Sequence, residues 1–356
     1  MSLQLLGWNA RFESAFAPHA ARGLVPARVA REDRDRYVVL DEGGARSAEL
    51  AGRLRHEARS RAELPAVGDW VALRPGAASS AIIDAVLPRS SAFVRKVAGE
   101  TTEEQVVAAN VDTVFLVSGL DGDFNPRRIE RYLASAWESG AEPVVVLNKA
   151  DLAEDLEARI AQVEAAAPGV GVVAMSALAG QGLDSLAPWL GAGRTVALIG
   201  SSGVGKSTLV NALLGEERQA TARVREDDSR GRHTTTHREL VPLPGGALLL
   251  DMPGMRELQL WGDESGLDGV FPEVTALAQR CRFRDCHHES EPGCAVLGAL
   301  ESGELEPERL ESWRKLQREL QWLAARQDAR ARAELESKWK AITKSMKHHP
   351  KADRWS

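Results

Sequence analysis

One short segment near the middle of the chain constrains the fold more than any other. Residues 200–207 read GSSGVGKS and match the pattern G-x-x-x-x-G-K-[ST] at every position. The apolar run TVALI precedes this segment and the helix-like TLVNALLG follows it, which is the strand–loop–helix context that a phosphate-binding loop (P-loop) requires. Its glycines allow backbone N–H groups to surround phosphate oxygens. The sequence therefore predicts a phosphate site, with Lys206 reaching the β- and γ-phosphates and the Ser207 hydroxyl binding Mg²⁺.

Further apolar runs surround this loop in the chain. They are VDTVFLVSG, EPVVVLNKAD, VGVVAMSAL and ALLLDMPG, and several of the segments between them have helical character. Strands that alternate with helices are typical of a mostly parallel sheet covered by helices. We therefore predict an α/β domain over residues 100–262.

Two segments predict which base this domain binds. Residues 148–151 read NKAD after an apolar run and resemble the NKxD guanine motif, and residues 176–178 read SAL and resemble its companion loop. The carboxylate of Asp151 can accept hydrogen bonds from guanine N1–H and the exocyclic amine. Adenine offers neither donor in that geometry, so the carboxylate would be left unpaired. The pair of motifs favours GTP over ATP.

The order of these motifs is unusual. NKAD and SAL precede the P-loop, whereas in an ordinary Ras-like GTPase the P-loop comes first. The same sheet can be built when the chain is cut at another loop and the old ends are joined, since chain ends lie at the surface. The sequence thus predicts a circularly permuted P-loop GTPase domain.

Two later segments resemble the switch regions of such domains. DMPG at 251–254 resembles the DxxG motif, in which Asp251 would hold Mg²⁺ through water and Gly254 would meet the γ-phosphate. Met252 replaces the usual threonine. Met255 stands where many GTPases have a water-orienting glutamine, so either hydrolysis is slow or another residue supplies the polar group.

The segment GRHTTT at 231–236 lies where the first switch is expected. Either Thr235 or Thr236 would bind Mg²⁺ and sense the γ-phosphate, and we assign this role to Thr235 provisionally. His233 either orients the attacking water or is an exposed loop histidine without a catalytic role. The predicted catalytic residues are thus Lys206, Thr235 and His233.

All three cysteines lie within fourteen residues, in a C-x4-C-x-H-x5-C pattern. Three thiolates and one imidazole suit tetrahedral Zn²⁺. The predicted ligands are Cys281, Cys286, His288 and Cys294, with His287 as the competing histidine. Because the protein would fill all four positions, the site is predicted to be structural.

The two ends of the chain flank this domain. Residues 1–24 have no clear pattern and are predicted to be a loosely ordered extension. Residues 25–90 contain short strand-like runs with Gly and Pro punctuation, which predict a small β-barrel. Residues 90–105 resemble a linker. Residues 263–356 are predicted to form a helical zinc-binding domain, with a helix over 306–347.

Composition and charge indicate the cellular compartment and the kind of partner. Hydrophobic residues make up 44% of the chain and charged residues 27%, which is ordinary for a soluble globular protein. There is no apolar run of membrane-spanning length and no secretory signal, so we expect a cytoplasmic monomer without a membrane partner. The net charge is −6, yet residues 337–356 carry six basic residues against one acidic residue.

The ordered set NKAD, GSSGVGKST, GRHTTT, DMPG and CRFRDC-H-H-ESEPGC resembles the bacterial ribosome-small-subunit-dependent GTPase A family. The resemblance covers nearly the whole chain from about residue 25. It implies a multi-domain fold made of an OB-fold, a permuted GTPase domain and a zinc-binding helical domain. It also implies GTP and GDP as substrate and product, with Mg²⁺ and one Zn²⁺ as cofactors. The implied partner is the small ribosomal subunit and its rRNA.

The resemblance further implies a GTPase that assists late maturation of the subunit and is stimulated by it. A GTP-gated RNA-binding adaptor with negligible hydrolysis is the alternative. The predicted nucleotide-binding residues are Asn148, Lys149, Ala150, Asp151, Ser176, Ala177, Gly200, Ser201, Ser202, Gly203, Val204, Gly205, Lys206, Ser207, Thr208, Asp251 and Gly254.

Overall fold

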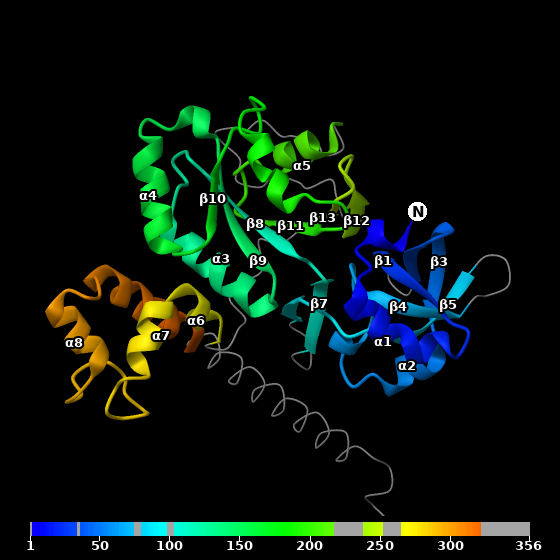
Figure 1. Ribbon diagram of the computed structural model, residues 1–356, viewed down its shortest axis with the longest axis horizontal. Coiled ribbons are helices and arrows are strands. Elements are labelled where there is room, and N and C mark those ends of the chain that lie inside the picture. Colours follow the sequence, from blue (N-terminus) through cyan, green and yellow to red (C-terminus); the bar gives the residue numbers. More distant parts are fainter. Residues whose placement is uncertain are drawn as a thin grey trace, which may run out of the picture.

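The computed structural model describes residues 2–33, 36–74, 80–97, 103–216, 238–251 and 265–321. The chain forms a β-barrel, an α/β domain and a helical region, which succeed one another from blue through green to orange in Figure 1. None of the helices in these ranges combines the length and the apolar character needed to cross a membrane.

The N-terminal region is a closed five-stranded barrel, as the sequence predicts. Its strands are β1 (Val25–Asp33), β2 (Arg36–Asp41), β3 (Gly44–Leu50), β4 (Trp70–Arg74) and β5 (Ser80–Val86). They pair in the cyclic order β1-β2-β3-β5-β4, and the β1–β4 pairing closes the ring. Alternate side chains such as Val29, Val39 and Ile83 point inward and are fully buried. Between β3 and β4 lie α2 (Gly52–Glu57) and η2 (Arg61–Glu63).

The prediction of a loosely ordered N-terminal extension is wrong. Residues 3–20 form η1 (Leu3–Leu6) and α1 (Ala10–Ala20), and the helix is capped by Asn9, whose Oδ1 accepts from two backbone N–H groups. Trp8 packs edge-on against Trp70 of the barrel with ring centroids 4.6 Å apart. Phe12 and Phe16 lie on one face of α1, Trp8 packs beside them just before the helix, and all three side chains are buried.

A buried arginine joins this extension to both neighbouring regions. The guanidinium of Arg28 donates hydrogen bonds to the carbonyls of Leu6, Gly68 and Asn110 at 2.5, 3.1 and 3.0 Å. Burial lowers the pKa of Arg28 to about 10, an effect that the nearby carboxylates of Asp112 and Asp69 partly offset. Arg28 therefore remains charged at neutral pH, where three segments of the chain meet.

The predicted linker at 90–105 is also incorrect. Residues 92–109 form an antiparallel hairpin of β6 (Ala92–Val97) and β7 (Glu103–Ala109). Phe93 and Val106 are buried in this hairpin. The apolar residues of these two strands alternate only weakly, so the sequence did not reveal them.

The α/β domain is built on a six-stranded section of sheet in the order β10-β9-β8-β11-β13-β12. Neighbouring strands in this section are parallel, except that β12 runs antiparallel to β13. The strands are β8 (Thr113–Gly119), β9 (Glu142–Asn148), β10 (Gly171–Ala174), β11 (Thr195–Ile199), β12 (Glu239–Pro242) and β13 (Leu248–Asp251). A single register pair, Arg31 with Glu239, continues this sheet into the barrel.

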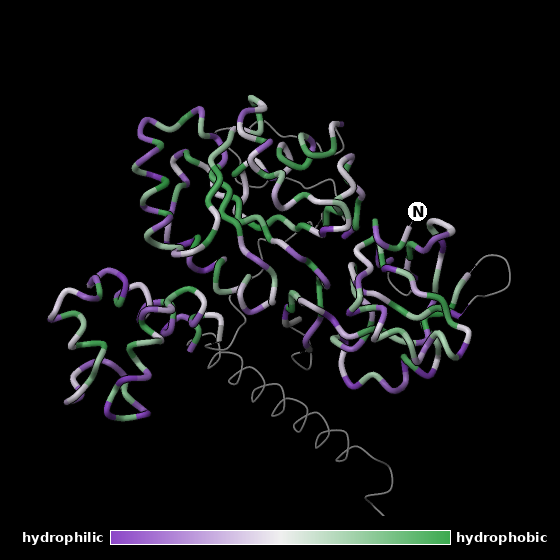
Figure 2. The backbone as a smooth tube through the Cα atoms, in the orientation of Figure 1, coloured by the Kyte–Doolittle hydropathy of each residue, from purple (hydrophilic) through white to green (hydrophobic). Residues whose placement is uncertain are grey.

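Helices cover both faces of this sheet. Val114 and Leu116 of β8 pack in one core with residues of α3 (Pro126–Ser139) and α4 (Leu156–Ala166). Phe115 and Val117 point the other way, into a second core with α5 (Lys206–Leu214) and η4 (Leu183–Trp189). The central strands are green along most of their length in Figure 2, as expected for strands buried on both faces.

The C-terminal region is helical and packs on α3. It contains α6 (Ser265–Val270), α7 (Pro272–Ala278), α8 (Ala295–Ser302) and a helical segment at 307–321. The glycines of α6 allow close approach, since a Cβ at Gly269 would lie 2.6 Å from the Trp137 ring. Arg309 donates to Glu130 of α3 at 3.2 Å and to Glu273 of α7 at 2.8 Å. The rest of the predicted 306–347 helix lies outside the described residues.

Candidate functional site

The P-loop connects β11 to α5, as its flanking sequence predicts. Glycine is required at two of its positions, because a Cβ at Gly200 would lie 2.2 Å from the Val117 carbonyl oxygen and one at Gly205 would lie 2.3 Å from Asn148 Nδ2. The ammonium of Lys206 donates to the carbonyls of Gly200 and Ser201 at 2.7 and 2.5 Å. These two bonds hold the ammonium against the backbone of the loop.

Asn148, the last residue of β9, ties the two predicted base loops to the phosphate loop. Its Nδ2 donates to the Val204 carbonyl at 2.8 Å, and its Oδ1 accepts from the Ala177 N–H at 2.9 Å. The side chain is only 2% exposed, so both amide groups need these partners. One residue therefore brings NKAD, SAL and the P-loop together.

The remaining NKAD residues lie at the rim of the site. Lys149 adopts a left-handed conformation with φ 64°, and its Nζ contacts Asp121 Oδ2 at 2.5 Å. Burial alone would raise the pKa of Asp121, but the hydrogen bond from Lys149 holds it below its usual range. Ala150 and Asp151 are in η3 (Ala150–Leu152), where Asp151 is exposed.

The SAL loop is held in a tight turn beside NKAD. Ser176 is 1% exposed, and its Oγ accepts from the Ala179 N–H at 3.2 Å. Ser176 also exchanges backbone hydrogen bonds with Gln181. Leu178 at the tip is 87% exposed. The turn thus fixes the backbone at Ala177 and leaves an apolar side chain at the mouth of the site.

The predicted magnesium residues lie at the same edge of the sheet. Ser207 is the second residue of α5 and Thr208 the third. Asp251 ends β13, which runs parallel to β11 with Leu250 opposite Ala197, so the backbone of Asp251 emerges beside the P-loop. The switch residues lie outside the described residues: His233, Thr235, Thr236, Met252, Gly254 and Met255.

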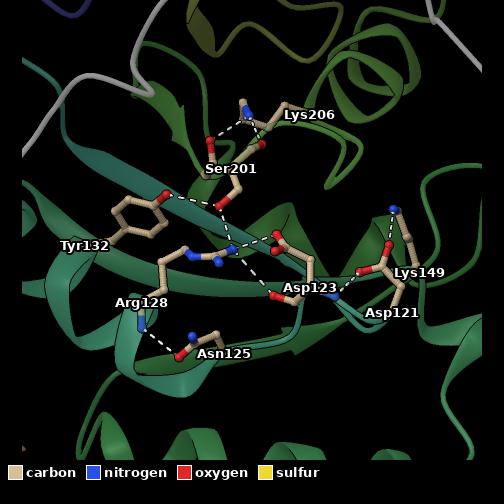
Figure 3. Close-up of polar contacts among 9 residues, drawn as sticks. Asp121, Asp123, Asn125, Arg128, Tyr132, Lys149, Ser201 and Lys206 are labelled. Carbon is tan, nitrogen blue, oxygen red and sulfur yellow. Dashed lines mark hydrogen bonds and ion pairs between the residues drawn. The ribbon is translucent and has the colours of Figure 1, made fainter. Parts of the chain in front are cut away.

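Two residues of α3, Arg128 and Tyr132, contact the P-loop and were missed from the sequence. Arg128 donates from Nη1 to Ser201 Oγ at 2.8 Å and to Asp123 Oδ2 at 2.6 Å, and the Tyr132 hydroxyl lies 3.3 Å from the same serine oxygen. Figure 3 shows these side chains meeting beneath the phosphate loop. Arg128 and Ser201 are 73 residues apart in the chain, and no motif connects them.

The predicted metal ligands form a second site in the C-terminal region. The ligand atoms of Cys281, Cys286, His288 and Cys294 all lie within 4.8 Å of one another. The Cys281 and Cys294 sulfurs are 3.8 Å apart, and His288 Nδ1 is 3.6 and 3.4 Å from them. These separations fit a tetrahedral ion with metal–sulfur bonds of about 2.3 Å.

The structure also distinguishes the two histidines. His288 is 4% exposed, while His287 is exposed and is not part of the cluster. Burial lowers the pKa of His288, which favours the neutral imidazole that a metal requires. The His288 ring packs against Trp313 with centroids 5.5 Å apart, and its carbonyl accepts from Arg314. The cluster therefore anchors the 307–321 helix.

A sheet whose P-loop strand lies in the centre, with the base loops earlier in the chain, defines the class of circularly permuted P-loop GTPases. The RsgA GTPase family model matches residues 86–261. The small ribosomal subunit biogenesis GTPase RsgA of Opitutus terrae is 53% identical over 100% of both chains, and that of Syntrophotalea carbinolica is 47% identical over 98% of this chain and 97% of its own. The chain belongs to the RsgA GTPase family.

Solved structures agree with this assignment. YjeQ from Thermotoga maritima is 29% identical, with a TM-score of 0.64 over 83% of this chain and 98% of its own. YloQ, described as a circularly permuted GTPase, has a TM-score of 0.62 over 84% of this chain and 95% of its own, and at 24% identity it shares the fold. The relatives are named GTPases, so the alternative of an adaptor with negligible hydrolysis is not supported.

The base assignment gives the first testable prediction. Asp151→Asn is expected to weaken GTP binding about a hundredfold, because two charge-assisted hydrogen bonds of about 1.5 kcal/mol each are lost. Xanthosine triphosphate carries an acceptor in place of the guanine amine, so the new amide should bind it better than the carboxylate does. Titration of both nucleotides into both proteins measures the change. Equal losses for the two nucleotides would show that Asp151 does not contact the base.

Proposed function

We propose that the chain hydrolyses GTP to GDP and phosphate in order to assist late maturation of the small ribosomal subunit, and that the subunit stimulates this reaction. The observation that carries the GTP site is the double hydrogen bond of Asn148 to Val204 and Ala177. It holds a base-reading loop and a phosphate loop at one site. The names of the relatives support the subunit as the partner.

The proposed roles follow from the chemistry of each group. Residues 200–207 surround the phosphates with backbone N–H groups, and Lys206 neutralises charge that develops on the γ-phosphate. Ser207 and Asp251 would hold Mg²⁺, which would neutralise negative charge on the phosphates. Asp151 reads guanine. The proposed switch roles of Thr235 and His233 rest on the sequence pattern alone.

The metal cluster would hold one structural Zn²⁺. Its four side chains occupy all tetrahedral positions, so no site is left for an activated water. We propose that the protein acts as a monomer. Ribosomal subunits are assembled in the bacterial cytoplasm, and we place the proposed function there.

Hydrolysis is tested by following phosphate release with and without purified small subunits. Turnover should rise when small subunits are added and should not rise with large subunits. If small subunits bind without changing turnover, the proposal of a stimulated GTPase is wrong.

The barrel offers a basic surface for RNA. Arg22, Arg53 and Arg74 surround Asp84 at 2.7, 3.8 and 2.5 Å, and the three arginine side chains are 52–58% exposed. Burial alone would raise the pKa of Asp84, but the hydrogen bonds from Arg22 and Arg74 hold it below its usual range. Arg53 also pairs with Glu57 at 3.2 Å. Three cations therefore stand beside two carboxylates, which leaves one excess positive charge for phosphate contacts.

We predict that docking is electrostatic and shared between both ends of the chain. Lys338, Lys340, Lys344 and Lys347 belong to the basic C-terminal segment, which lies outside the described residues. Replacing all four with alanine should weaken subunit binding and reduce the slope of log affinity against log salt by up to about 3. GTP affinity of the free protein is the control and should not change. Wild-type binding with a wild-type salt slope would show that docking depends on other residues.

A further inference from the structure

The first turn of α3 is connected to the P-loop by a charged side chain. Asn125 caps the helix, with its Oδ1 accepting from the Arg128 N–H at 3.3 Å. From this fixed backbone the Arg128 side chain extends to Ser201, the second residue of the P-loop (Figure 3). Asp123 binds the same guanidinium nitrogen at 2.6 Å. These two contacts fix the position of the guanidinium, and the guanidinium in turn fixes the Ser201 hydroxyl.

Ser201 transmits this contact to the phosphate-binding lysine. Its side chain accepts from Arg128, while its backbone carbonyl accepts from Lys206 Nζ at 2.5 Å. The space between α3 and the P-loop is lined by side chains from both, including Ile129, Tyr132 and Val204. A displacement of Ser201 would therefore move one of the two carbonyls that orient the lysine.

A role in folding alone does not account for this arrangement. Arg128 is 33% exposed and Asp123 is 43% exposed, and an ion pair at that exposure contributes at most about 1 kcal/mol to stability. The neighbouring Arg127 is more exposed, at 47%, and only approaches Glu311 at 4.0 Å. Of these two adjacent arginines, Arg128 is the one that contacts the P-loop.

We propose that Arg128 is a positioning residue for GTP hydrolysis, which acts through Ser201 to keep the P-loop carbonyls and Lys206 in their reactive arrangement. The inference rests on the proposed GTP site. Charge that develops on the γ-phosphate in the transition state is stabilised only by donors that are already oriented. Ground-state binding is shared among many loop N–H groups, Mg²⁺ and the base contacts. Loss of the positioning contact should therefore lower kcat more than nucleotide affinity.

The test compares Arg128→Met with Arg127→Met in the full-length protein. Arg128→Met is expected to lower kcat about tenfold or more, with KM for GTP and affinity for GDP within about threefold of wild type. Arg127→Met is expected to match wild type in all three. Arg128→Lys keeps the positive charge but has a shorter, more flexible side chain without the planar guanidinium, so it should give an intermediate kcat. Thermal unfolding of each variant checks the fold.

A double-mutant cycle tests whether the effect passes through Ser201. Ser201→Ala alone should lower kcat to a similar extent, and the double variant Arg128→Met/Ser201→Ala should be no slower than the slower single variant. Effects that multiply would show that the two residues act independently and would overturn the inference. So would an Arg128→Met variant that loses GDP affinity as much as kcat.

The outcome also separates this inference from the proposed function. If wild-type protein turns over GTP no faster than Lys206→Ala, the proposed GTPase activity itself is wrong. If wild type is active and Lys206→Ala is not, but Arg128→Met retains wild-type kcat, the GTP site stands and the role of Arg128 is refuted.

Discussion

Replacing Lys206 with alanine is expected to lower GTP turnover by about a thousandfold while leaving the protein folded. The ammonium is the only charge that the P-loop itself carries, and two carbonyls of the same loop hold it in place. Removing it leaves charge on the γ-phosphate uncompensated in the transition state. Because Lys206 is not part of the buried core, thermal stability should change little. Single-turnover phosphate release at saturating GTP measures the loss.

A matched control is available on the surface. Lys315 lies exposed on the 307–321 helix, so Lys315→Ala removes the same charge at a position remote from the loop and should retain wild-type turnover. Near-normal hydrolysis by Lys206→Ala would mean that the P-loop assignment is incorrect.

Removing the metal should have the second large effect, on the C-terminal region. We expect about one Zn²⁺ per purified chain, and about 10 kcal/mol of binding free energy linked to folding. That figure is comparable to the whole stability of a typical domain. His288→Ala should therefore lose the metal and unfold the region around the cluster, including the helix that Trp313 and Arg314 attach to it.

His287→Ala is the matched control, since this adjacent histidine is exposed and lies outside the cluster. It should keep both the metal and the protection of the C-terminal helices. Elemental analysis and hydrogen exchange of the full chain report the two effects. Purified wild-type protein without metal, or His287→Ala without it, would contradict the ligand assignment.

The sequence predicted the parts of the site that lie within single motifs. The P-loop, NKAD and the cysteine cluster each have a local pattern that determines the chemistry, and all three have the expected context in the fold. The hydrogen bond between Asn148 and Val204 could not be predicted from the sequence, because it joins residues 56 positions apart. Arg128 had no signal at all, since its partner depends on how α3 packs.

The errors in the predicted fold have a similar physical origin. The first 24 residues have no clear sequence pattern, because their helix is short. Their aromatic side chains pack against Trp70, which lies far along the chain. The strands β6 and β7 were interpreted as a linker because their apolar residues alternate only weakly. Tertiary packing therefore decided both segments, whereas the parallel strands were evident from local apolar runs.

The two hydrogen bonds of Asn148 have a consequence for the order in which the domain can fold during translation. Translation proceeds from the N-terminus, so residues 148–178 leave the ribosome before residues 200–207. The amide of Asn148 can find its Val204 partner only after the P-loop has emerged, and the strand that ends at Asp251 follows later still. In a nascent chain, the segment predicted to contact guanine is therefore complete before the P-loop is synthesised. In a chain with the ordinary order of motifs, the P-loop is synthesised first.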